Sequence, residues 1–328
     1  MAGALRGRWP VPRARATIAG TLSDAPQAIG HTLDVQGLSV TIEGSGPTVV
    51  MLHGWPDSPA LWDGAVAALR DGYRCVRFAL PGYDLSRPPR PVSVDEMCAL
   101  VAAVVDAVSP DEPVSLVLHD WGCFFGYEYA ARHPQRVARV VGTDVGDTNS
   151  GAYLRALTLR QQGLIAGYQV WLAVAWTLGR WLPGLADRMT RFMARRVGCR
   201  APSARIGWPM NYPYAMRWFG ACGGLRGVAR VDKVFGPRIP TLFCFGTRKP
   251  FMFHSARWLA ALAATPGCRV QGFDAGHWLM LQKPAEYHAA VRGWLDESTA
   301  AAPTGSQPAR LCDPSHSGLL PLCLQPQK

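Results

Sequence analysis

Short apolar runs alternate with longer amphipathic stretches along most of this chain. The runs are rich in β-branched or aromatic residues and lie at Val49–Leu52, Cys75–Leu80, Val114–Leu118, Val140–Asp144, Pro240–Phe245 and Arg269–Phe273. Apolar positions with helical spacing separate most of them, at Ala60–Arg70, Val94–Val108 and Cys123–Arg132, and follow the last run at Ala285–Leu295. Nearly continuous apolar strands between helices are typical of a parallel sheet covered on both faces. The pattern therefore predicts an α/β fold with a mostly parallel, twisted sheet flanked by helices.

The alternation of strands and helices stops in the middle of the chain. Residues 148–235 contain helical stretches rich in tryptophan and arginine but no strand–helix repeat. We therefore expect a helical cap inserted into a core domain that is made of residues 30–147 and 236–297. Residues 1–29 and 298–328 hold few large apolar side chains that could build a core, so they are predicted to be a disordered leader and a disordered tail.

The formal net charge of +11 comes from the inserted segment. Residues 151–235 hold thirteen basic residues and only two acidic ones, Asp187 and Asp232. A basic cap attracts anionic substrates or an anionic membrane surface, although such arginines are also typical of a solvated face, and no nucleic-acid partner is expected. The apolar stretch Leu164–Leu182 approaches membrane-spanning length, but its polar residues and glycines favour a cap helix over a membrane-contacting surface.

Cysteine spacing and the N-terminal composition bear on the compartment. The nine cysteines are scattered and include no CxxC pair, which favours reduced thiols in the cytoplasm over disulfides or a zinc site. The first twenty residues lack the apolar core of a signal peptide, yet they carry Arg6, Arg8, Arg13 and Arg15 with no acid. A mitochondrial location is therefore the alternative to a cytoplasmic one.

A carboxylate occupies the place where a strand turns sharply into a helix. Asp120 follows the apolar run Val114–Leu118 and precedes the helical stretch Cys123–Arg132. At the tip of such a turn, a side chain lies beside backbone N–H groups that stabilise negative charge. An aspartate nucleophile attacks carbon and leaves an alkyl ester on the enzyme, which suits opening an epoxide or displacing a halide better than ordinary ester hydrolysis.

Four motifs occur in a recognisable order, namely His53-Gly54-Trp55-Pro56, Pro81-Gly82-Tyr83, His119-Asp120-Trp121-Gly122 and Gly276-His277-Trp278. With them the chain resembles the epoxide hydrolase and haloalkane dehalogenase branch of the α/β-hydrolase superfamily over residues 30–297. The resemblance implies the α/β-hydrolase fold and a cofactor-independent hydrolase without a metal. Leu118 departs from the family pattern, which has a small residue two positions before the nucleophile.

The resemblance also implies a role for each reacting group. His277 would be the general base that activates water, and the backbone N–H groups of Trp55 and Trp121 would form an oxyanion hole. The acid that orients the histidine usually follows the strand Pro240–Phe245, but the loop after that strand carries Lys249 instead. Some relatives place the acid one strand earlier, which makes Asp144 the first candidate. Asp147 is the second, and both residues alternatively cap the next helix.

Aromatic residues of the expected cap supply the remaining candidates. The resemblance implies two cap tyrosines that donate protons to an opened epoxide. Tyr168 would be the first, and either Tyr212 or Tyr214 the second, with aromatic packing as the alternative role. Trp171, Trp218, Phe251 and Trp278 lie in segments expected to face the site, which predicts an apolar substrate pocket.

Trp55 separates the candidate reactions. Haloalkane dehalogenases commonly carry asparagine at this position, whereas epoxide hydrolases carry an aromatic residue. The prediction is therefore an epoxide hydrolase that forms a vicinal diol from a lipophilic epoxide through an ester on Asp120. A dehalogenase that uses the same aspartate and histidine is one alternative. A non-catalytic binding protein is another, since Lys249 and Leu118 are compatible with a decayed site. The oligomeric state is left open.

Overall fold

The computed structural model describes residues 30–225, 227–229 and 239–300. Eight strands form one sheet in the order β1-β2-β4-β3-β5-β6-β7-β8. They are β1 (His31–Val35), β2 (Leu38–Glu43), β3 (Thr48–Leu52), β4 (Arg74–Phe78), β5 (Val114–His119), β6 (Val137–Thr143), β7 (Thr241–Gly246) and β8 (Arg269–Phe273). The strands from β4 to β8 pair in parallel, whereas β2 pairs antiparallel with both β1 and β4. The predicted α/β class with a mostly parallel sheet is confirmed.

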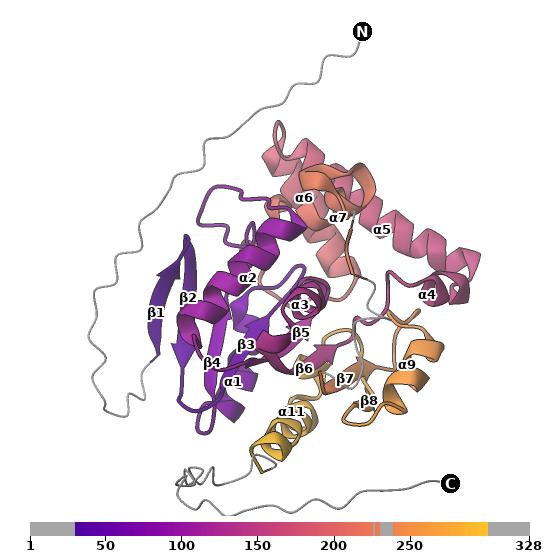
Figure 1. Cartoon of the computed structure of the whole chain (residues 1–328). Helices are drawn as coiled ribbons and strands as arrows, with labels where there is room; N and C mark the ends of the chain where they lie inside the picture. The colour runs from indigo at the N-terminus through magenta and orange to yellow at the C-terminus, as the bar shows by residue number, and fades with distance from the viewer. Residues whose placement is uncertain (1–29, 226, 230–238, 301–328) are drawn as a thin grey trace, which may run out of the picture.

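Helices cover both faces of the sheet (Figure 1). One face packs against α2 (Val94–Val108), α3 (Trp121–Arg132) and α9 (Ala256–Ala263), and the other against α1 (Asp63–Leu69), α10 (Leu279–Gln282) and α11 (Pro284–Ala300). Side chains along a strand point alternately to the two faces. In β3, accordingly, Val50 and Leu52 join the first core while Val49 and Met51 join the second. Because both faces are covered, every position of β3 is buried, and four apolar residues in a row follow Thr48.

Four helices from the inserted segment lie over one end of the sheet (Figure 1). They are α4 (Gly151–Ala156), α5 (Leu159–Leu178), α6 (Pro183–Arg196) and α7 (Tyr212–Phe219), and α5 packs against both α6 and α7. The cap helix predicted at Leu164–Leu182 corresponds to α5, which begins five residues earlier, at Leu159, and ends four residues earlier, at Leu178. Within the described ranges, no helix combines the length and apolarity needed to cross a membrane.

Some elements were not predicted from the pattern. The hairpin of β1 and β2 escaped detection because β1 is exposed at every position but Val35 and therefore has no apolar run. Helix α9 was also missed. Helix α11 continues to Ala300, past the expected end of the core at residue 297. The expected disordered leader, and the tail from residue 301 onward, lie outside the described residues.

The turn between β5 and α3 is packed too closely for added atoms. A Cβ at Gly122 would collide with the carbonyl oxygens of Leu52 and His53 at the end of β3. One turn later, a Cβ at Gly126 would collide with the side chain of Leu118. Gly126 thus makes room for the leucine that departs from the family pattern, so Leu118 is accommodated in the fold.

We expect Gly122→Ala to lower the free energy of unfolding by about 1–3 kcal/mol, because the opposing atoms are backbone carbonyls that cannot move aside. The matched control is Gly293→Ala in α11, an exposed position where an added Cβ meets nothing within 4 Å. That variant should gain about 0.5–1 kcal/mol from helix propensity. Urea unfolding of the two variants measures both changes, and equal effects would contradict the close approach at Gly122.

Candidate active site

Asp120 is held in an unusual backbone conformation at the turn between β5 and α3. Its φ of 54° lies in the left-handed region, where residues other than glycine are strained. The backbone N–H of Trp55 donates a 2.6 Å hydrogen bond to Asp120 Oδ1. The backbone N–H of Trp121 also hydrogen-bonds the carboxylate. The two N–H groups predicted as an oxyanion hole therefore both reach the candidate nucleophile.

His277 lies between two carboxylates. Its Nε2 is 3.5 Å from Asp120 Oδ2, and its Nδ1 is 2.5 Å from Asp144 Oδ2. The ring of His119 stacks beside it with centroids 4.5 Å apart, and His119 Nε2 donates a 3.1 Å hydrogen bond to the His277 carbonyl. The histidine loop is thus tied to β5, and Asp120, His277 and Asp144 come together although they are far apart in sequence.

The charges around His277 decide its protonation. Burial by itself lowers the pKa of the imidazole, but the hydrogen bonds and charges of Asp120 and Asp144 outweigh it and raise the pKa to about 9. Burial acts against the charged form of Asp144 as well, yet His277 and Lys249 hold the pKa of this carboxyl at about 2. The pKa of Asp120 is also lowered, since the stabilising hydrogen bonds and charges, those of His277 foremost, outweigh its burial. At neutral pH the site therefore contains two carboxylates and an imidazolium.

Asp144 has a second cationic partner that the sequence analysis missed. Lys249 Nζ forms an ion pair with Asp144 Oδ1, and the backbone N–H of Gly246 donates a 3.0 Å hydrogen bond to the same oxygen. Lys249 occupies the position where relatives carry the acid, which sequence reasoning treated only as a lost carboxylate. The signal was present in that substitution, because a buried cation at the end of β7 requires an anion on the neighbouring strand.

The second candidate for the acid, Asp147, does not reach His277. Its carboxylate accepts hydrogen bonds from the hydroxyls of Ser150 and Ser255 and from the backbone N–H of Ser255. These two serines are the N-caps of α4 and α9. Asp147 therefore links the N-termini of α4 and α9 through their N-cap serines, a role close to the capping alternative. The structure makes it a structural residue and not the acid that orients His277.

The cap tyrosines separate into two groups. Tyr168 and Tyr214 line the same cavities as Asp120, with their ring centroids 6.1 Å apart. Tyr214 also packs edge-on against Trp55 and Trp121. Tyr212 lines neither cavity. Its buried ring contacts Tyr83, and its hydroxyl has no hydrogen-bond partner among the described residues. Of the two alternatives for the second tyrosine, only Tyr214 is positioned beside the nucleophile.

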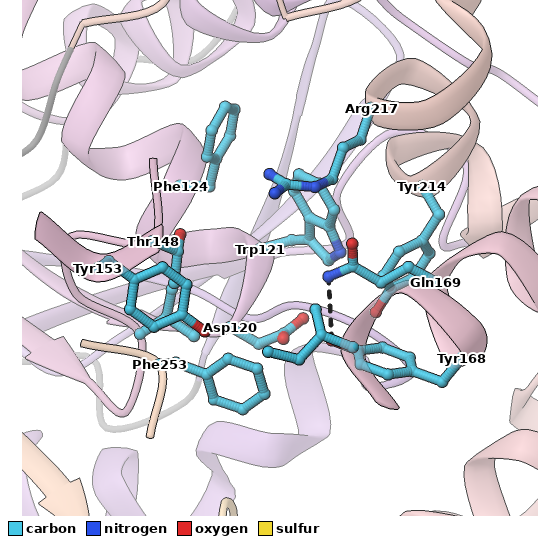
Figure 2. A pocket seen from close by; sticks show the side chains of 12 residues that line it. Asp120, Trp121, Phe124, Thr148, Tyr153, Tyr168, Gln169, Tyr214, Arg217 and Phe253 are labelled. Carbon is cyan, nitrogen blue, oxygen red and sulfur yellow. Dashed lines mark hydrogen bonds between the residues drawn. The ribbon is translucent and has the colours of Figure 1, made fainter. Parts of the chain in front are cut away.

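A hydrogen bond from Gln169 orients Tyr168 (Figure 2), and a second one links Gln169 to Trp218. Gln169 Nε2 donates to the Tyr168 hydroxyl at 3.1 Å, and Gln169 Oε1 accepts from Trp218 Nε1 at 3.0 Å. A phenol oxygen that accepts from an amide keeps its own proton available for another acceptor. Trp218 therefore acts on the site through Gln169, which the sequence analysis did not identify.

The site opens into two cavities that share Asp120. The larger one, of about 850 Å³, is lined by residues that include Trp55, Asp120, Tyr214, Phe251, His277 and Trp278. The smaller one, of about 60 Å³, is shown in Figure 2. The expected lining by Phe251 and Trp278 is thus observed. Trp171 and Trp218 line neither cavity, so the prediction that they face the substrate pocket was wrong. Trp171 is partly exposed because its indole turns outward and donates to the Met189 carbonyl.

Trp55 connects the core to the cap. Its indole Nε1 donates a 2.8 Å hydrogen bond to Asn211 Oδ1, and Asn211 Nδ2 donates to Thr190 Oγ1 on α6 at 2.7 Å. All three side chains are buried. The sequence analysis did not foresee this link, which depends on residues 156 positions apart. Because of it, the indole N–H of Trp55 is already occupied and is not available to a substrate atom.

Comparisons with known proteins show the family to which this fold belongs. A family model described as the alpha/beta hydrolase fold matches residues 47–284. A cis-3-alkyl-4-alkyloxetan-2-one decarboxylase of Shewanella oneidensis is 31% identical over 79% of this chain and 85% of its own length. A probable oxidoreductase EphD of Mycobacterium tuberculosis is 43% identical over 90 residues, so this chain spans only 15% of that relative.

A solved structure extends the comparison to the whole fold. The epoxide hydrolase of Bacillus megaterium aligns with a TM-score of 0.61 and 20% identity, covering 81% of this chain and 100% of that one. A likeness at this identity establishes the fold and not the reaction. Together the matches confirm the superfamily resemblance that the four motifs predicted.

The raised pKa of His277 predicts how stability depends on pH. A folded-state pKa of about 9, above the ordinary 6.5, contributes stability that is complete below pH 6.5 and is lost as the pH rises through 9. Between these limits the wild type should lose about 1–3 kcal/mol more of its unfolding free energy than His277→Gln. Urea unfolding at a series of pH values measures both slopes, and parallel slopes would show that His277 is not charged in the folded protein.

Proposed function

The chain belongs to the α/β-hydrolase fold family, and from this starting point we propose that it hydrolyses lipophilic epoxides to vicinal diols. The observation that carries the proposal is the shared lining of one cavity by Asp120 and by two tyrosines, Tyr168 and Tyr214. An epoxide needs both partners, because its carbon takes a nucleophile while its oxygen takes a proton.

In the first step, Asp120 attacks a ring carbon and forms a hydroxyalkyl ester. Tyr168 and Tyr214 donate hydrogen bonds to the ring oxygen, which would otherwise leave as an unstabilised alkoxide. Gln169 supports this step, since its amide occupies the phenol oxygen of Tyr168 and directs the proton away from itself. The apolar lining of the larger cavity favours substrates with hydrocarbon substituents.

In the second step, water cleaves the ester. His277, oriented by Asp144, takes a proton from water, which attacks the carboxyl carbon of Asp120. The N–H groups of Trp55 and Trp121 then stabilise the oxyanion, since one already contacts Asp120 Oδ1 at 2.6 Å. The bond between the carboxyl carbon and the alkyl oxygen then breaks, and the leaving oxygen takes the second proton of the attacking water. The vicinal diol leaves, Asp120 is restored as a carboxylate, and His277 keeps the first proton as an imidazolium.

Observed contacts weigh against the alternatives to this reaction. A halide ion needs N–H donors, yet the indole N–H of Trp55 is bound to Asn211 and the Trp121 side chain hydrogen-bonds Tyr214, which disfavours dehalogenation. The binding-protein alternative rested on Lys249 and Leu118. Lys249 pairs with Asp144, and Leu118 fits against Gly126, so neither residue disrupts the site.

Opening of a four-membered lactone is a second candidate, and the near full-length match to an oxetan-2-one decarboxylase favours it. An oxetan-2-one is a strained ring, and attack of Asp120 on its alkyl carbon would release a carboxylate. Loss of carbon dioxide from that intermediate, with Asp120 as the leaving group, would give an alkene. The two candidates share the first step and differ in the product, so product analysis separates them.

We expect His277→Gln to accumulate the ester intermediate, because no base remains to activate water. Incubation with excess styrene oxide should raise the intact mass of the protein by the mass of one substrate molecule, whereas Asp120→Ala should show no adduct. The wild type should release the diol. Absence of both diol and adduct, together with release of carbon dioxide from a cis-dialkyl oxetan-2-one, would replace the epoxide proposal with the lactone one.

The tyrosines give a second test. Tyr168→Phe and Tyr214→Phe should each lower the rate of ester formation by about 10²–10⁴-fold, the usual contribution of a positioned acid. The matched control is Tyr212→Phe, on the same helix as Tyr214, which removes a buried hydroxyl without a partner among the described residues and should leave the rate unchanged. Stopped-flow tryptophan fluorescence during a single turnover reports the step. A loss in Tyr212→Phe as large as that in Tyr214→Phe would refute the assignment.

A further inference from the structure

Two neighbouring cations after β7 have very different surroundings. The Lys249 side chain is 6% exposed and pairs with Asp144, which is fully buried. The Arg248 side chain is 65% exposed and pairs with Asp274 at the surface. The Lys249 ammonium also lies 5.4 Å from the centroid of the Phe253 ring, and it borders the large cavity. Burying a lysine is costly, so its position beside the acid of the site calls for an explanation.

We propose that Lys249 is a positioning residue that sets the proton affinity of His277 through Asp144, so that the imidazole becomes a base once Asp120 is esterified. The proposal rests on the proposed function for the identity of the ester. The geometric basis of the proposal is independent of that function, because Lys249 and His277 bind the two different oxygens of the Asp144 carboxylate. A change in the charge of Lys249 is therefore transmitted to His277 across a single buried group.

The charge balance around His277 changes during the reaction. In the free enzyme, two carboxylates and one ammonium surround the imidazole, so an excess negative charge favours the imidazolium. Ester formation makes Asp120 neutral. Asp144 and Lys249 then cancel, and burial favours the neutral imidazole. Without Lys249, the unbalanced charge of Asp144 would keep His277 protonated and unable to accept a proton from water.

The proton balance is consistent with this sequence. Epoxide opening consumes one proton at the ring oxygen, which becomes a hydroxyl. His277 loses one proton as it changes from imidazolium to imidazole, and the tyrosines or solvent in the cavity carry the equivalent proton to the new hydroxyl. One carboxylate charge and one imidazolium charge disappear together, so the net charge of the site is unchanged by the first step.

Three other titratable groups around this cluster come from three different segments. His119 on β5 stacks on His277, Asp57 interacts electrostatically with it, and His254 faces Lys249 and Asp144. Burial lowers the pKa of His119 to about 3, which keeps it neutral, and raises the pKa of Asp57 to about 7. The charge of Lys249 also contributes to the lowered pKa of His254, so the titration of His254 is followed together with that of His277.

The first experiment measures the pKa of His277 directly, without any substrate. Asp120→Asn replaces the carboxylate by a neutral amide of similar shape and therefore mimics the charge of the ester. In this background, Lys249→Met and Lys249→Gln should each raise the pKa of His277, followed by NMR of labelled histidine, by about one unit or more. Lys249→Gln retains a hydrogen-bond donor for Asp144, which guards against a variant that fails to fold.

One control keeps the positive charge beside Asp144, and the other removes a positive charge at the surface. Lys249→Arg should keep the pKa of His277 unchanged, and Arg248→Met should do the same because its exposed charge is screened by water. An unchanged pKa in folded Lys249→Met and Lys249→Gln would overturn the proposal. Since no turnover is involved, this outcome is independent of whether the protein acts on epoxides.

The second experiment uses turnover. In otherwise wild-type protein, Lys249→Met should shift the acid limb of ester hydrolysis, measured in single turnovers, to higher pH by the same amount. The rate would fall about tenfold below the limb and recover fully above it. A loss of equal size at every pH would mean that Lys249 only supports the structure, and it would overturn the proposal. Absence of any epoxide turnover in the wild type would instead refute the proposed function.

Discussion

The site depends on a carboxylate held at a strained turn. Asp120 adopts a positive φ because β5 and α3 are both fixed by the core and leave no room for a wider connection. The same close packing requires glycine at position 122 and brings the end of β3 near enough for Trp55 N–H to reach the carboxylate. The candidate nucleophile and the N–H groups beside it are therefore placed by one constraint, the approach of two buried strands and a helix.

A second buried carboxylate links the rest of the site to this turn. Asp144 also has a positive φ, directly after β6, and its two oxygens serve His277 and Lys249. The backbone N–H of Gly246 adds a third partner. A fully buried carboxylate is stable only when its charge is met by such partners. Adjacent parallel strands supply them, since the loops after β6, β7 and β8 leave the sheet at the same edge.

Much of the fold could be predicted because burial on both faces leaves a strong local signal. The apolar runs of β3 and β5 and the spacing of α2 are visible without any tertiary information. The exposed strand β1 has no such signal, and the hairpin that it forms depends on pairing with β2. The candidate nucleophile and base could be predicted from motifs for a similar reason, since a turn of this geometry restricts which residues fit around Asp120.

Side-chain direction and long-range pairing were beyond the sequence. Tyr212 and Tyr214 are two positions apart, and only the placement of α7 against α5 decides that Tyr214 lines the cavity. Trp171 and Trp218 looked equally suited to a pocket, yet one turns outward and the other acts through Gln169. The sequence by itself determined which turns after strands carry Asp120 and His277, because local packing and backbone geometry restrict the residues at such turns. Only the tertiary structure decided that Lys249 and His277 share Asp144, because the electrostatic cost of burial is settled by which distant charges the fold brings together.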